Sequence, residues 1–182
     1  MLRLSPALTL ADWFALADWQ ALDEGDIDLG SMGPTLLQGG LVFQAGKSGE
    51  GYLLRVNKLG HIGGEVFSDS IGGAAFGGTA YAPPYVFVPR TNGLVALHID
   101  GAGPSFKVAW SDPRFYAGPP VVAGGSVWTV DIGSGTLYGF SVDNGEVLAR
   151  IPLGPVMHFT TPTLSQGKIL VAANRQIISL GY

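Results

Sequence analysis

The chain has 182 residues, of which 47% are hydrophobic and 13% are charged, a charged share about half that of an average soluble domain. The net charge is −4 and the lysines and arginines are scattered, so we expect no nucleic-acid binding. The absence of cysteine excludes disulfides, thiolate metal sites and cysteine nucleophiles. The 28 glycines and 12 prolines favour short strands joined by tight turns, which predicts an all-β fold.

The first thirty residues differ in composition from the rest of the chain. Residues 8–22 are rich in alanine, leucine and tryptophan, and the tetrapeptide Leu-Ala-Asp-Trp occurs twice among them. This pattern predicts a short amphipathic helix that packs Trp13, Leu16 and Trp19 against the sheets. The N-terminal domain is therefore expected to be a helical or irregular segment over residues 1–30.

No targeting signal or membrane span is expected from the apolar stretches. Pro6 and Asp12 interrupt the N-terminal apolar run before the core of a signal peptide is complete. The stretch from Ser70 to Pro89 carries no charge. Its glycines and prolines would leave backbone groups unpaired in lipid, so it is not expected to span a membrane. We interpret that stretch as a loop and an inner strand.

From Pro34 onwards one phrase recurs, in which a proline or glycine pair precedes a short apolar strand, a glycine-containing turn and a second apolar strand. Equivalent positions in the four copies are Val42, Val86, Val127 and Ile169, which lie 44, 41 and 42 residues apart. This period is the length of one four-stranded propeller blade. The expected blades cover about 31–77, 78–115, 116–155 and 156–182, the last one incomplete.

The third copy predicts its strands most clearly. They are expected at residues 120–122, 127–131, 136–141 and 146–151, and the last turn contains an Asn-Gly pair that tolerates positive φ. Residues 106–110 are the matching outer strand one blade earlier.

The fourth copy has strands near 169–172 and 176–180 but no outer strand, which leaves an open sheet edge. Residues 2–10 could supply that strand and close a four-bladed ring. We favour the alternative, in which the chain is a partial propeller, the C-terminal half of a larger ring whose other blades are missing or come from a partner.

Aromatic side chains recur at equivalent strand positions and are expected to stack between blades. A cofactor-stacking tryptophan is the less frequent alternative. These residues are Phe43, Phe87, Trp110, Trp128 and Tyr138.

The segment from Gly133 to Ile151 resembles the pyrroloquinoline-quinone-type (quinoprotein-like) propeller repeat. Leu137-Tyr138, Asp143 and Gly145 match the Leu-Tyr, Asp and Gly of that repeat, and the segments from Gly49 and Asn92 are similar to it. Residues 26–37 resemble the start of a blade in bacterial members of this superfamily. The resemblance covers about residues 26–182.

The resemblance implies two classes of function. Members of the superfamily include quinone-dependent dehydrogenases with a calcium-bound quinone and an aspartate base, and non-catalytic proteins such as an outer-membrane assembly factor. Many of the dehydrogenases have a vicinal cysteine pair over the cofactor, which this chain lacks. The resemblance to this superfamily also implies a periplasmic or extracellular location.

Polar residues at equivalent turns are candidates for a ligand site. In a propeller, the turn between the second and third strands and the link into the innermost strand lie on one rim of the channel. Polar residues at these turns are typical of a ligand-binding site, but they are also found in ordinary solvated hairpins. The solvated hairpin is the more frequent case. The candidate cofactor-binding residues are Lys47, Arg90, Asp131 and His158, with Asn174 and Arg175 at the last turn.

The remaining candidate groups have weaker patterns. Glu24, Asp26 and Asp28 offer oxygen ligands for calcium, but they do not have the spacing of a calcium loop, and turn formation is expected instead. His61 and His98 have no partners at metal-ligand spacing, so no metal site is predicted.

These observations predict a non-enzymatic binding or scaffold module that holds a partner or ligand at the channel rim. No cofactor is expected under this hypothesis. The partner would be the remaining propeller blades, another protein or a second copy of the chain. The alternative hypothesis is a fragment of a quinone-dependent oxidoreductase, for which pyrroloquinoline quinone and calcium would be the cofactors.

Overall fold

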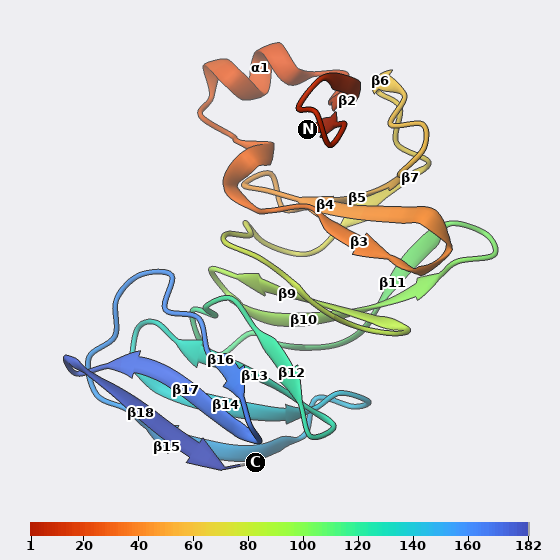
Figure 1. Cartoon of the computed structure of the whole chain (residues 1–182). Helices are drawn as coiled ribbons and strands as arrows, with labels where there is room; N and C mark the ends of the chain where they lie inside the picture. The colour runs from red at the N-terminus through yellow and green to blue at the C-terminus, as the bar shows by residue number, and fades with distance from the viewer. Residues whose placement is uncertain (182) are drawn as a thin grey trace.

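The computed structural model describes residues 1–181, which form a partial β-propeller of stacked antiparallel sheets. Figure 1 shows the blades following one another from the N-terminal end at the top to the C-terminal end at the bottom. In the described residues, no helix is both long enough and apolar enough to cross a bilayer.

Three blades have four strands each, and their order along the sheet matches their order in the chain. Blade 1 consists of β3 Thr35–Leu37, β4 Leu41–Ala45, β5 Glu50–Arg55 and β7 Phe67–Ser70. Blade 2 consists of β8 Ala80–Ala82, β9 Tyr85–Arg90, β10 Gly93–Asp100 and β11 Ser105–Asp112. Blade 3 consists of β12 Val121–Ala123, β13 Ser126–Asp131, β14 Thr136–Ser141 and β15 Val147–Pro152.

Blade 4 has three strands, β16 Thr163–Ser165, β17 Lys168–Ala173 and β18 Gln176–Gly181. Within residues 1–181 no outer strand pairs with β18, as the sequence predicts. The partial propeller expected from the repeat is confirmed.

Successive side chains along a strand point to opposite faces of its sheet, so each central strand packs against two neighbouring blades. In β9, Val86 and Val88 join the core shared with blade 1, whereas Phe87 joins the core shared with blade 3. In β13, Val127 faces blade 2 and Trp128 faces blade 4. The core is therefore a series of apolar layers between blades.

The aromatic residues expected between blades lie in these layers. Phe43 of blade 1 meets Phe106 of blade 2 edge to face, with ring centroids 5.7 Å apart. Trp110 lies between Phe87 of its own blade and Phe140 of blade 3. The interpretation as inter-blade packing residues is confirmed for these side chains.

The N-terminal segment contains β1 Leu2–Leu4, β2 Leu10–Ala15, α1 Trp19–Glu24 and the 3-10 turn η1 Leu29–Ser31. A second 3-10 turn, η2 Gln38–Gly40, lies within blade 1, and β6 His61–Ile62 pairs in parallel with β2.

The expectation of one helix over residues 8–22 is wrong in its first half, which forms β2. The reason is tertiary: β2 pairs with β1 and β6, and this pairing places Phe14 and Leu16 on Val42 and Leu54 of blade 1. Trp19 does not pack as expected, since 45% of its side chain is exposed.

We call β1, β2 and α1 the N-terminal cap, because they cover the face of blade 1 that points away from blade 2. Trp13 in this cap stacks on His61, with ring centroids 4.8 Å apart. Since β1 pairs with β2 and not with β18, residues 2–10 do not close the last blade within the chain.

Candidate functional site

The rim is formed by the links that enter the blades and by the turns between second and third strands. In every blade the link accepts a backbone hydrogen bond from that turn. The backbone amides of the turns donate to backbone oxygens of the links at 2.7–3.0 Å. The pairs, each with its donor first, are Lys47 to Asp28, Thr91 to Ala74, Ile132 to Tyr116 and Asn174 to Pro155. Two links also reach back to the preceding blade, where Ala75 donates to Gly46 and Ala117 to Arg90. The rim backbone is therefore tied across blades.

Lys47 lies at the first of these turns and is engaged by the acidic N-terminal turn. Its Nζ donates to the Asp26 carboxylate at 3.0 Å and lies 2.7 Å from the Asp28 carboxylate. The hydrogen bond to Asp28, followed by that to Asp26, raises the pKa of Lys47 above its usual value. The two aspartates considered as calcium ligands thus hold a lysine.

Arg90 lies at the second turn but points into the protein, and only 5% of the residue is exposed. Its guanidinium donates to the backbone oxygen of Ile71 and to the Ser111 hydroxyl, both at 2.7 Å. Burial lowers the pKa of Arg90, and its Nε has no hydrogen-bond partner among the described residues. This side chain holds the link to blade 2 and does not face the rim surface.

Asp131 lies at the third turn and is also largely buried. Its carboxylate accepts hydrogen bonds from the Gly133 amide at 2.9 Å and the Ser134 hydroxyl at 2.6 Å. This is the arrangement of an aspartate that stabilises its own turn. At the fourth turn, Asn174 and Arg175 both adopt positive φ, of 48° and 62°.

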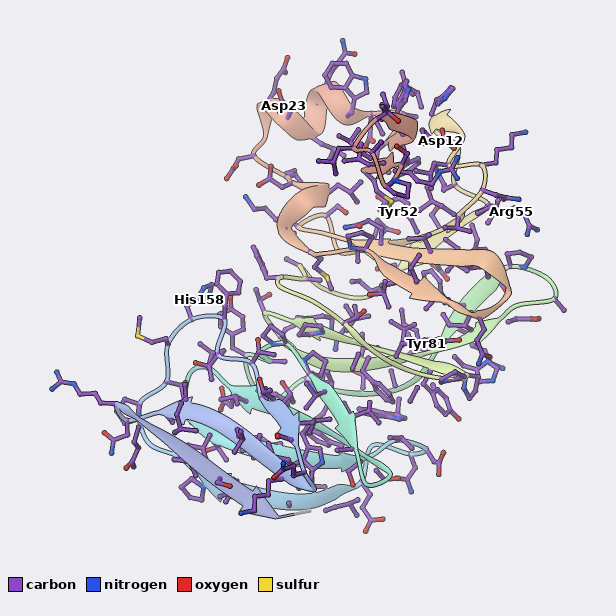
Figure 2. All side chains as sticks on the ribbon, in the orientation of Figure 1. Asp12, Asp23, Tyr52, Arg55, Tyr81 and His158 are labelled. Carbon is purple, nitrogen blue, oxygen red and sulfur yellow. The ribbon has the colours of Figure 1, made fainter. Side chains whose placement is uncertain are left out.

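His158 lies in the link to blade 4 and belongs to an aromatic cluster at the rim (Figure 2). Its Nε2 is 2.7 Å from the Tyr116 hydroxyl of the preceding link, and its ring meets Phe159 edge to face at 4.2 Å. Phe159 has a φ of 67° and is 52% exposed. A bulky residue in this left-handed region is unusual, and such strain often accompanies functional positions.

Tyr116 and Phe159 were not singled out from the sequence. A signal for Tyr116 exists in the sequence. Tyr116 lies four residues before Pro120 and His158 lies four residues before Pro162, and each of these prolines directly precedes an inner strand. We call Tyr116, His158 and Phe159 the rim cluster.

Within residues 1–181, no hydrogen bond or ion pair joins Lys47, Arg90, Asp131 and His158 to one another, and each has other partners inside the protein. Residues 1–181 contain no group of three or more histidine, aspartate or glutamate side chains placed to hold a metal ion. With Lys47 held by two carboxylates and the Asp131 carboxylate used in its own turn, the rim residues do not fit a calcium-bound quinone.

A groove of about 670 Å³ lies beside the rim cluster, at the end of blade 4. It is largely apolar, and it runs between the link and the β17–β18 turn. Its lining includes Val156, Met157, Ala172, Arg175 and Ile177. Met157 and Ile177 are among the most exposed apolar side chains of the protein, at 79% and 67%.

No family model and no curated protein matches the sequence. Solved structures do match. BamB from Moraxella catarrhalis is 15% identical with a TM-score of 0.64, and the match covers 82% of this chain and 46% of that one. The β-propeller domain of Cps50 (Swd1) from Myceliophteria thermophila is 10% identical with a TM-score of 0.71, covering 90% of this chain and 56% of that one.

The computationally designed protein Ika4 is 11% identical with a TM-score of 0.62, and the match covers 83% of this chain and 89% of that one. The chain therefore has a β-propeller fold and spans about half the length of the natural propellers it matches. At these identities the likeness concerns the fold alone.

Proposed function

We infer that this chain is a non-enzymatic binding module, built on repeats of the pyrroloquinoline-quinone type, that holds a protein partner at its rim. The observation that carries this proposal is the rim cluster. It offers an exposed aromatic ring, Phe159, beside a histidine whose orientation is set by Tyr116. Aromatic and methionine side chains are enriched in protein interfaces, and Met157 directly precedes His158 in the chain.

The chemistry of the rim supports binding over catalysis. A general base must reach a substrate proton, and a nucleophile needs a base beside it. Lys47, Arg90 and Asp131 are occupied by hydrogen bonds within the protein, and His158 is paired with a tyrosine. The polar groups thus organise the links, and the apolar cluster remains for contact with a partner. A periplasmic or extracellular location is part of the same proposal and rests on the repeat resemblance.

The test is a selection of random displayed peptides on the whole chain, followed by calorimetry with the peptides obtained. Phe159→Ser should weaken their binding by at least about tenfold, because aromatic anchors dominate the binding free energy. His61→Ala, a histidine remote from the rim, is the matched control and should leave the affinity unchanged. Peptides whose affinity is the same for wild type and Phe159→Ser would contradict the proposal.

A further inference from the structure

The two end faces of the blade stack differ in whether another part of the chain covers them. The outward face of blade 1 is covered by the N-terminal cap, which places Phe14 and Leu16 on it. The outward face of blade 4 has no such cover among the described residues. We call this surface, made by β16, β17 and β18 on the side away from blade 3, the open face.

The sequence of β17 is that of a strand buried on both sides. In its Lys-Ile-Leu-Val-Ala-Ala run, Ile169 and Val171 pack on blade 3, whereas Leu170 and Ala172 point the other way. The central strands β9 and β13 have the same continuous apolar character, and both of their faces are buried by neighbouring blades. Ile177 pairs with Ala172 and shares its outward face, where 67% of the isoleucine is exposed. The open face thus matches an inter-blade surface.

A complementary surface exists at the other end of the same chain. The cap exposes a group of leucines on β1, on β2 and in the turn between them. They are Leu2 at 67%, Leu4 at 48%, Leu8 at 79% and Leu10 at 58%. Among residues 1–181, β1 pairs only with β2 and β18 pairs only with β17, so both ends present an unpaired strand edge there.

The charges of the two ends are opposite. Residues 1–30 carry six carboxylates and one arginine, a net charge of −5, and residues 146–182 carry one carboxylate and three basic residues, a net charge of +2. Asp26 and Asp28 are engaged by Lys47, but Asp18, Asp23 and Glu24 make no ion pair within residues 1–181. The same holds for Lys168 and Arg175 at the open face. Opposite potentials favour head-to-tail contact over contact between like ends.

The length of the stack fits two copies to a ring. About four fifths of the chain matches 46% of BamB, so two such stacks amount to roughly one propeller of that size. The match covers 89% of Ika4, so that designed protein has a similar extent. Within residues 1–181, β1 and β18 are not paired with each other, so these strands do not close the stack on itself. A head-to-tail contact closes after two copies when it corresponds to a half-turn about the ring axis.

We propose that two copies of this chain form one closed ring, in which the N-terminal cap of each copy covers the open face of the other. The ring contains two identical contacts, each between the exposed leucines of one copy and the surface around Ala172 and Ile177 of its partner. The inference does not depend on the rim cluster, which lies in the links between blades.

Cross-linking tests the arrangement directly, because the chain has no cysteine of its own. A mixture of Leu4→Cys and Ile177→Cys proteins should form a disulfide-linked dimer on oxidation, and neither variant alone should do so. Ala102→Cys, in the exposed loop between β10 and β11, mixed with Ile177→Cys is the control and should stay uncross-linked. Cross-linking of Ile177→Cys alone would reveal a face-to-face dimer and overturn the proposal.

Sedimentation gives the second measurement. The wild type should have twice the 19.0 kDa mass of one chain. Ile177→Asp and Leu2→Asp should each weaken the dimer by at least about tenfold, since each buries a charge in an apolar contact.

The Phe159→Ser variant separates this inference from the proposed rim function, because it should keep the wild-type mass. A wild type that remains at 19.0 kDa at all concentrations would refute the ring, and so would unlimited head-to-tail filaments.

Discussion

The indole Nε1 of Trp110 donates a hydrogen bond to the backbone oxygen of Val142, 3.0 Å away, and thereby joins blade 2 to blade 3. The indole ring also lies in the apolar layer between these blades and is 9% exposed. The contact combines a directional bond with a large buried area, so it should contribute strongly to the stability of the stack.

Trp110→Phe should therefore lower the free energy of unfolding by about 1–3 kcal/mol, because it leaves the Val142 carbonyl without its donor and removes buried ring atoms. Urea denaturation measures the change. Trp19→Phe is the matched control, since Trp19 is 45% exposed and should change stability by less than about 0.5 kcal/mol. Equal effects of the two substitutions would contradict this role for Trp110.

The turn before β15 requires glycine at position 145 for two reasons. Gly145 has a φ of 72°, and a Cβ placed on it would lie 2.6 Å from the Trp110 ring. Gly125 has a similar φ of 73° but no atom within 4 Å of such a Cβ. Gly125→Ala should cost about 1 kcal/mol through backbone strain alone, and Gly145→Ala should cost clearly more. Similar urea midpoints for both variants would show that the ring moves away freely.

The pair formed by Asp112 and Arg114 should make stability depend on pH at the acid end. Hydrogen bonds from the Arg114 guanidinium, 2.5 and 2.8 Å long, and from its backbone amide lower the pKa of Asp112 below 3.8. A carboxylate with a depressed folded-state pKa stabilises the fold above pH 3.8, and this contribution disappears as the pH falls through the folded-state value.

Asp112→Asn should consequently be less stable than wild type at pH 7, with the difference shrinking below about pH 3.8. Urea denaturation at a series of pH values measures it. Asp23→Asn, which alters a carboxylate without an ion pair in residues 1–181, should stay within about 0.5 kcal/mol of wild type at pH 7. A constant difference for Asp112→Asn across the pH range would exclude the proposed titration.

Titration with pyrroloquinoline quinone and calcium separates the binding module from the oxidoreductase alternative. We expect no saturable change in quinone absorbance at micromolar concentrations, because Lys47 and Asp131 are already engaged within the protein. Saturable binding that is lost in Asp131→Asn would support the alternative and place the cofactor at the rim.

The repeat made the blades predictable in some detail. The strands expected at residues 127–131 and 136–141 lie within β13 and β14, and the missing outer strand of the last blade is absent from residues 1–181. These features depend on local alternation and turn chemistry, which each stretch of sequence carries by itself.

Long-range partners decided the remaining features. Residues 10–15 have a helical composition but form a strand, because β1, β6 and the face of blade 1 satisfy its backbone and bury Phe14. Lys47 was recognisable as a rim residue, but its engagement by Asp26 is set by the fold across 21 residues of sequence. The contact between His158 and Tyr116 likewise joins residues 42 apart. Local pattern thus determined the strands of the repeated blades, whereas tertiary packing determined the strand at residues 10–15 and which side chains remain available for binding.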